Sequence, residues 1–158
     1  MPGKANARSM VLAVLLACGF FQCQTRTQTE GNTPAAKTVA WRTDLATAQA
    51  SAMSTRKPVM TVFTAAWCPW CKRMQDSTFI DPRVVEKTAA FVTVKIDVDS
   101  QKTVADRFNA NARKHGGMGI PNTLFLSPNG VILKHAVGYY DAKTFLVLMD
   151  SVLTALPR

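Results

Sequence analysis

The chain has 158 residues, of which 47% are hydrophobic and 18% are charged, so it can form one domain with a substantial core and is not a disordered chain. The formal net charge is +9, but the basic residues are spread along the chain and interleaved with acidic ones. Because nucleic-acid binding needs clustered positive charge, the composition argues against a nucleic-acid partner.

The N-terminal segment has the pattern of an export signal. Lys4 and Arg8 precede an apolar run from Met10 to Phe21, and about 12 residues are too few to span a bilayer but fit a signal peptide. Within the run, Leu15-Leu16-Ala17-Cys18 resembles the lipobox of bacterial lipoproteins. Plain cleavage nearby is the alternative. We therefore expect residues 1–23 to direct export to the periplasm or cell envelope, with Cys18 as the candidate lipidation site and no other membrane contact.

A polar tether and one domain follow the signal. Residues 24–40 are rich in threonine and glutamine and have no hydrophobic periodicity, which predicts a flexible linker. Residues 41–158 have the pattern of a single globular domain. Asp44 is placed to cap a helix that continues to about Arg56. Val59–Thr64 is a nearly continuous, β-branched apolar run, which predicts a strand buried on both faces.

Three more helices and a strand are predicted in the next part of the chain. We expect a helix from Cys68 to about Phe79, and another from the Asp81-Pro82 pair to about Ala90. Phe91–Val98 predicts the second strand, and the carboxylate of Asp99 just after it is expected to be solvated. Ser100 can cap a third helix that runs to about Lys114.

A hairpin and a last helix complete the predicted domain. Thr123–Leu126 and Val131–Lys134 flank Ser127-Pro128-Asn129-Gly130, which is a strong turn sequence. Asp141 is placed to cap a helix to about Leu156. Strands separated by helices favour a parallel pair, and the hairpin adds antiparallel strands at one edge. The order predicts a three-layer α/β fold, a central mixed sheet with helices on both faces.

The candidate catalytic residues are Cys68 and Cys71, which open a helix directly after the buried strand. A thiol at a helix N-terminus faces free N–H groups, so Cys68 should be partly thiolate near neutral pH. The thiolate is the attacking species in disulfide exchange, and Cys71 is within reach to resolve the mixed disulfide. Zinc binding would need two further Cys or His ligands, and the chain has no second pair at conventional spacing, so we expect no metal and no cofactor.

The residues around these cysteines suggest a substrate surface. Pro69 suits the first turn of a helix, and Trp67 and Trp70 would place apolar surface beside the thiols, with core packing as the alternative for each. Farther along the chain, Ile120-Pro121 precedes a strand. In the fold that this order of elements resembles, a cis-proline loop at this position lies against the cysteines, and the backbone of Ile120 would then offer strand-like hydrogen bonds to a bound substrate chain.

Together these motifs resemble the thioredoxin superfamily over about residues 41–158. The closest resemblance is to the periplasmic thiol:disulfide interchange branch, especially the C-terminal domain of the bacterial transmembrane disulfide reductase. The resemblance implies the thioredoxin fold, with Cys68 as nucleophile, Cys71 as resolving thiol, Pro121 as the cis-proline and Lys95 as the family's buried lysine. The matching segments are Lys57–Met60, Ala66–Lys72, Thr78–Val84, Gly119–Pro121 and Val137-Gly138.

Two positions depart from the family pattern. The buried aspartate expected six residues before the nucleophile is Val62 here, and the acid that often follows the motif is Gln75. Without these carboxylates, deprotonation of Cys71 must rely on water or on Lys95. The direction of electron flow therefore stays open, with reduction preferred.

The function expected from these observations is that of an exported thiol–disulfide oxidoreductase. Its Cys68/Cys71 pair would exchange with disulfides of exported proteins and would be recharged by a membrane or periplasmic redox partner. We expect a monomer. The alternative is a non-catalytic binding module whose cis-proline groove holds a client or a metallochaperone. That alternative predicts full function after replacement of Cys68 and Cys71 by serine.

Overall fold

The computed structural model describes residues 38–156 of the chain. The predicted signal segment, its candidate lipidation site Cys18 and nearly all of the predicted linker lie outside the described residues. No helix within the described part is long and apolar enough to cross a membrane.

A four-stranded mixed sheet forms the centre of the domain, with the strand order β2-β1-β3-β4. β1 (Val59–Thr64) pairs with β2 (Val92–Asp97) in parallel and with β3 (Asn122–Leu126) antiparallel. β4 (Ile132–Val137) pairs with β3 through the predicted hairpin. All six residues of β1 are buried, as the apolar run predicts for a strand covered on both faces.

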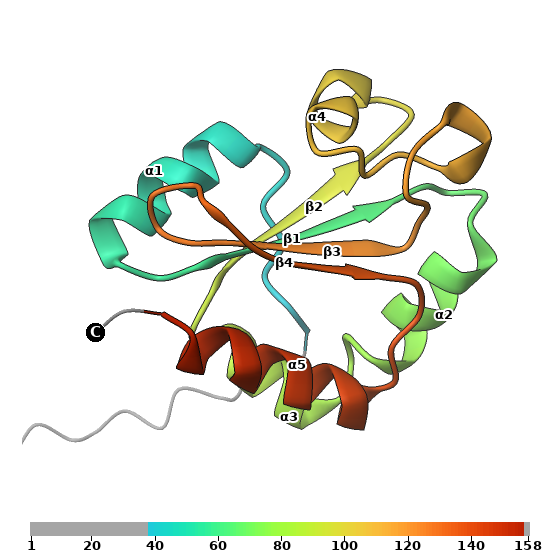
Figure 1. Ribbon diagram of the computed structural model, residues 1–158. Coiled ribbons are helices and arrows are strands. Elements are labelled where there is room, and N and C mark those ends of the chain that lie inside the picture. Colours follow the sequence, from blue (N-terminus) through green and yellow to red (C-terminus); the bar gives the residue numbers. More distant parts are fainter. Residues whose placement is uncertain (1–37, 157–158) are drawn as a thin grey trace, which may run out of the picture. The chain divides into compact units, whose positions relative to one another are not determined.

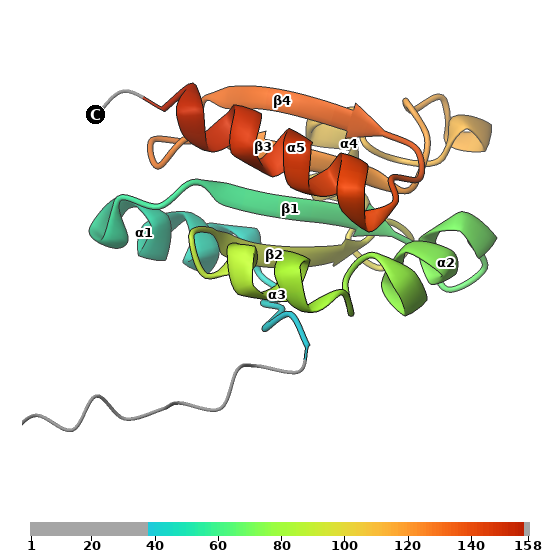
Figure 2. The ribbon, with the colours of Figure 1, turned by 90° about the horizontal axis from the view of Figure 1, so that it is seen from below.

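Helices cover both faces of this sheet (Figures 1 and 2). α1 (Leu45–Thr55) and α4 (Lys102–Arg107) lie on one face, while α3 (Pro82–Thr88) and α5 (Ala142–Thr154) lie side by side on the other. α2 (Pro69–Ser77) begins beyond the carboxyl end of β1. Each face has its own core of buried apolar side chains. The predicted three-layer α/β fold is confirmed.

The predicted helix caps are formed by aspartates. Asp44 accepts the backbone N–H of Thr47 at 2.7 Å, and Asp141 accepts that of Thr144 at 2.8 Å. Asp81 accepts the backbone N–H of Arg83 and is also held by its guanidinium. These hydrogen bonds from Arg83 lower the pKa of Asp81 to about 2. Since the folded pKa lies below the usual 3.8, this cap stabilises the fold above that pH and is lost as the pH falls toward 2.

The helix after β2 differs from the prediction at both ends. Its N-cap is Gln101 rather than Ser100, because the Ser100 N–H and hydroxyl both donate to Asp97 Oδ1 in the turn that precedes it. It ends at Arg107 rather than at Lys114. Two residues after its end, Asn109 takes a left-handed conformation with φ 50°. The N–H groups of Asn109 and Ala110 bond to the carbonyls of Asp106 and Ala105, which closes the helix in a Schellman motif.

Candidate active site

Cys68 and Cys71 form a disulfide at the start of α2. Cys68 is the N-cap, with an extended backbone conformation, and its Sγ accepts the backbone N–H of Cys71 at 3.1 Å. Pro69 occupies the first turn, where a missing N–H costs nothing. The strand β1 therefore delivers the first cysteine to the N-terminal end of a helix, where the free N–H groups favour a negative charge on sulfur.

The two cysteines are shielded from bulk water. Cys68 exposes 4% of its surface and Cys71 exposes 3%, and both belong to the core between the sheet, α1 and α4. The two cysteines therefore do not differ in burial. They differ in their position on the helix: Cys68 is the N-cap and its Sγ already accepts an N–H, while Cys71 lies within the helix.

The loop before β3 carries the predicted proline. The Ile120–Pro121 peptide bond is cis, and the Pro121 carbonyl accepts the N–H of Gly138 at 2.8 Å, which ties the loop to the end of β4. Pro121 is buried and Ile120 is half-buried. Within residues 38–156 the backbone N–H and C=O of Ile120 take part in no hydrogen bond with the backbone, so they are available to an incoming chain.

Trp67 is held in place on both its edge and its face. It exposes 46% of its surface, its indole N–H donates to Asp99 Oδ2 at 2.6 Å, and Lys114 Nζ lies 3.8 Å from the ring centroid. Asp99 is exposed, as expected for a solvated carboxylate, and the turn after β2 also brings it to the indole, a contact that was not predicted. Core packing is excluded for Trp67 at this exposure, so its ring serves as a fixed apolar surface beside Cys68.

Trp70 is the second exposed ring of the motif, with 52% of its surface exposed. It packs against Tyr139 with the ring centroids 5.8 Å apart. The guanidinium of Arg73 lies 5.3 Å from the Trp70 ring and 5.0 Å from the Tyr139 ring. Tyr139, two residues after the end of β4, and Arg73, in the second turn of α2, thus fix the position of Trp70.

These residues surround two adjoining hollows, which we call the groove. One, of about 540 Å³, lies between Trp67, Trp70, Ile120 and the segment that carries Arg113. The other, of about 320 Å³, lies between Trp70, Ile120, Pro121 and Tyr139. The structure thus brings four of the predicted substrate and catalytic residues, Trp67, Trp70, Ile120 and Pro121, to one surface at the start of α2.

Lys95 lies on β2, directly beside Val62 in the parallel register. It is half-buried rather than buried, so the expectation of a buried lysine holds only in part. On the other side Val62 faces Thr123, whose buried hydroxyl has no hydrogen-bond partner within the described residues. The position where the family places an aspartate is therefore apolar and is flanked by two polar side chains.

Several residues of the groove were not predicted from the sequence. Arg73 follows Trp70 by three positions on a predicted helix, a spacing that places them on the same face and could have revealed the pair. Tyr139 directly follows the Val137-Gly138 pair that supports the resemblance. Lys114 and Asp99 reach Trp67 only through the tertiary fold, and no local pattern could have predicted those contacts.

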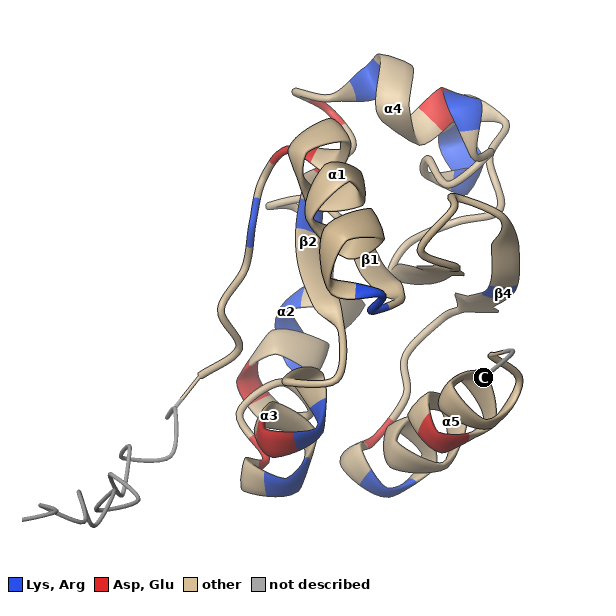
Figure 3. Ribbon diagram, turned by 90° about the vertical axis from the view of Figure 1, so that its left-hand side faces the viewer, with Lys and Arg blue, Asp and Glu red and all other residues tan. Residues whose placement is uncertain are grey.

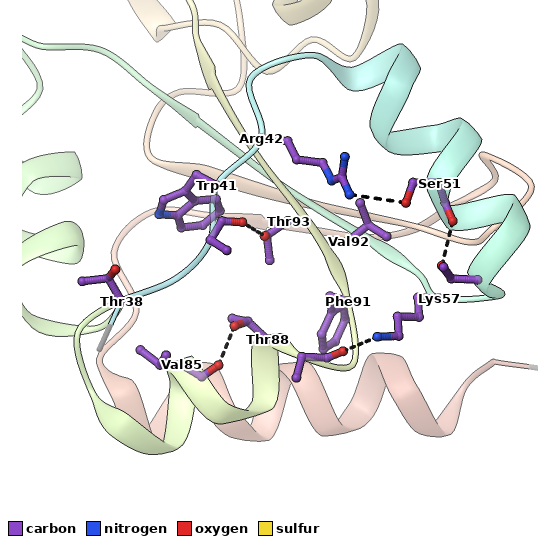
Figure 4. A pocket seen from close by; sticks show the side chains of 13 residues that line it. Thr38, Trp41, Arg42, Ser51, Lys57, Val85, Thr88, Phe91, Val92 and Thr93 are labelled. Atoms are coloured by element: carbon purple, nitrogen blue, oxygen red, sulfur yellow. Dashed lines mark hydrogen bonds between the residues drawn. The ribbon is translucent and has the colours of Figure 1, made fainter. Parts of the chain in front are cut away.

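A further cavity of about 600 Å³ lies at the opposite end of β1, where the chain enters the sheet (Figure 4). Most of its polar side chains are bonded to the protein: Lys57 Nζ donates to the Ala89 carbonyl at 2.7 Å, and the Thr93 hydroxyl donates to the Ala40 carbonyl at 2.5 Å. Nearby, the backbone of Arg42 bonds to β2 at Thr93 and Lys95. This cavity therefore lies where the segment before α1 packs against the sheet, and its polar groups serve that packing.

Comparison with known proteins relates the chain to thiol:disulfide interchange proteins. It is 35% identical over 100 residues to DsbD of Salmonella paratyphi A, covering 61% of this chain and 17% of that protein. It is also 35% identical over 104 residues to DsbD of Ralstonia nicotianae, covering 65% of this chain and 17% of that protein. The chain thus spans about a sixth of the length of these curated relatives.

Solved structures share the fold at lower identity. The DsbH oxidoreductase superposes with a TM-score of 0.62 at 20% identity, covering 77% of this chain and 89% of that one. The C-terminal domain of DsbD from Neisseria meningitidis gives 0.55 at 21% identity, covering 67% and 90%. Both likenesses confirm the predicted fold, and the homology to DsbD agrees with the predicted class of thioredoxin-like oxidoreductase. A family model described as a thioredoxin-like domain matches residues 45–153, and the chain belongs to that family.

Proposed function

We propose that the protein is an exported thiol–disulfide oxidoreductase that reduces disulfides of exported proteins through Cys68 and Cys71. The observation that carries the proposal is the position of Cys68. It caps α2 with its Sγ accepting the Cys71 N–H, beside a groove lined by Trp70 and the Ile120–Pro121 loop. The relatives named thiol:disulfide interchange proteins support the same chemistry.

The proposed reaction transfers two electrons from the protein to the client. The Cys68 thiolate attacks one sulfur of the client disulfide, which forms a Cys68–client disulfide and releases the other client sulfur as a thiolate. Cys71 then loses its proton, and its thiolate attacks Cys68 Sγ. The Cys68–Cys71 disulfide forms and the second client sulfur leaves as a thiolate. A dithiol of a membrane or periplasmic redox partner must reduce the disulfide again before the next cycle.

Deprotonation of Cys71 is the step at which this chain departs from the family pattern. With Val62 at the aspartate position, no carboxylate there can accept that proton, so water is left to accept it. Lys95 is the register neighbour of Val62, and we assign it a supporting role through its positive charge, which favours the thiolate. Slow deprotonation of Cys71 would lengthen the life of the mixed disulfide without changing the direction of the overall exchange.

Export is proposed from the N-terminal pattern of Lys4, Arg8 and the apolar run that follows. Attachment through a lipid on Cys18 and release as a soluble periplasmic protein are both consistent with it. The mass of the mature N-terminus distinguishes the two, because a lipidated chain would begin at a modified Cys18.

Trapping of a mixed disulfide tests the proposed function. In the reduced Cys71→Ser protein, Cys68 can attack a disulfide-bonded peptide but nothing in the active site can release it. We expect a covalent protein–peptide adduct on Cys68 in mass spectrometry, which disappears on adding dithiothreitol. Reduced wild-type protein should pass through the adduct and release peptide thiol. A binding module would form no adduct in the Cys71→Ser protein and would keep its client affinity, which would overturn the proposal.

A further inference from the structure

Three basic side chains at the groove have no acidic ion-pair partner among residues 38–156. Within residues 38–156 the ion pairs of lysine and arginine engage Lys72, Arg83, Lys87 and Lys102. Arg73, Arg113 and Lys114 are in none of them. All three are exposed, and each is placed at the groove by contacts described above. Within the described part of the chain, these three cations therefore make no ion pair of their own at the groove.

The three cations lie on two sides of the groove. Arg113 and Lys114 belong to the short 3-10 helix η1 (Arg113–His115), which lies on one side of the start of β3, and Arg73 belongs to α2 on the other (Figure 1). The hollow beside Arg113 and Lys114 is lined by Trp67, Trp70 and Ile120, and the guanidinium of Arg73 lies against the Trp70 ring. An extended chain bound along Ile120 would therefore have apolar surface beneath it and a cation near each end.

The segment that carries Arg113 and Lys114 is held firmly. The N–H groups of Met118 and Gly119 bond to the carbonyls of Asn109 and Asn111 at 2.9 Å. The Asn111 side chain donates to Asp106 Oδ1 at 2.6 Å. Hydrogen bonds from Lys102, and then from Asn111, lower the pKa of Asp106, so this anchor stays ionised. The cations are therefore presented from a fixed loop.

Two carboxylates lie near the groove. Asp76 is paired with Lys72, while Asp99 accepts the N–H of the neutral Trp67 indole and keeps its charge, so the three cations face one carboxylate that has no ion pair within the described residues. On α3 and α5, basic and acidic residues are interspersed (Figure 3), and Lys87 of α3 pairs with Asp150 of α5. The unpaired positive charge at the groove thus contrasts with the mixed charge of the opposite layer.

We propose that the groove selects clients whose reactive cysteine is flanked by acidic side chains. This inference rests on the proposed function and adds a substrate class to it. Carboxylates on either side of the client cysteine would lie near Arg73 at one end and near Arg113 and Lys114 at the other. Charge complementarity of this kind acts mainly on the association rate and is screened by salt.

The test compares three disulfide-bonded peptides that differ only in the residues flanking cysteine: Glu, Ser or Lys. The second-order rate of Cys68 oxidation is measured by stopped flow with the reduced full-length protein at low and high salt. We expect the Glu peptide to react about tenfold faster than the Lys peptide near 0.01 M ionic strength, with Ser between them and the difference shrinking above about 0.15 M. The Arg113→Glu/Lys114→Glu protein should reverse the order.

Arg56→Glu is the matched control, since it reverses an exposed charge beside the turn after β3, at the end of that strand opposite to Pro121, and should keep the order of the three peptides. Equal rates for the three peptides at low salt would overturn the inference while leaving the proposed function in place. So would a Glu preference that the double variant does not alter. Failure of all three peptides to react would instead refute the proposed function, and the client preference with it.

Discussion

Replacing Cys68 with serine is expected to reduce disulfide exchange to the uncatalysed rate. The variant keeps the helix cap, since a serine hydroxyl also accepts the Cys71 N–H. It removes the only thiolate placed at the N-terminus of α2, and Cys71 lies within the helix with 3% of its surface exposed. The rate is measured as release of peptide thiol from a disulfide-bonded peptide, with dithiothreitol as reductant.

The reciprocal variant makes this result specific. Cys71→Ser should also lose turnover, but it should form the mixed disulfide that Cys68→Ser cannot form. Thermal unfolding of both proteins in the reduced state checks that each remains folded. If Cys68→Ser formed the adduct and Cys71→Ser did not, the roles assigned from the helix position would be reversed.

The second large effect is expected at Gly117, which supports the loop that carries Arg113 and Lys114. A Cβ there would stand 1.3 Å from Asn111 Oδ1 and 2.5 Å from the Asn111 carbonyl oxygen. The side chain could turn away, but the backbone oxygen belongs to the residue whose carbonyl accepts the Gly119 N–H. Overpacking of this kind costs about 1–3 kcal/mol, and we expect Gly117→Ala to lower the free energy of unfolding by the upper part of that range.

Gly116→Ala is the matched control. Gly116 has a positive φ of +80°, yet a Cβ there would meet no atom within 4 Å. In that variant, backbone strain alone should lower the free energy of unfolding, by about 1–2 kcal/mol. Gly117→Ala should in addition displace the cations and reduce the preference for the Glu peptide. Chemical denaturation of both proteins gives the comparison. A Gly117→Ala protein that is no less stable than Gly116→Ala and keeps the Glu preference would contradict the predicted clash with Asn111.

Much of the fold could be predicted because its signals are local. The apolar run at Val59–Thr64, the aspartate caps and the Ser127–Gly130 turn each act through neighbours in sequence, and the structure has all of them where expected. The end of α4 was predicted too late, because the break depends on Asn109 taking a left-handed conformation. Asparagine tolerates that conformation, but the sequence does not show where it does so.

The groove could be predicted in part for the same reason. Cys68, Trp67 and Trp70 are adjacent in sequence, so their grouping needed no tertiary information. The approach of Lys114 and Asp99 to Trp67 depends on how η1 and the turn after β2 fold over the sheet. The extent to which Lys95 is covered likewise depends on packing, and the structure leaves it half-buried.

The equilibrium reduction potential of Cys68 and Cys71 tests most directly whether they act as a reducing pair. The full-length protein is equilibrated in buffers of reduced and oxidised thiols, and alkylation followed by mass spectrometry of the peptide that holds Cys68 and Cys71 gives the fraction oxidised. We predict a potential between about −270 and −220 mV, in the range of thioredoxin and the glutaredoxins. A value near −120 mV, as in a strong disulfide donor, would contradict the reductive direction. A pair that did not titrate at all would contradict the proposal that the protein is an oxidoreductase.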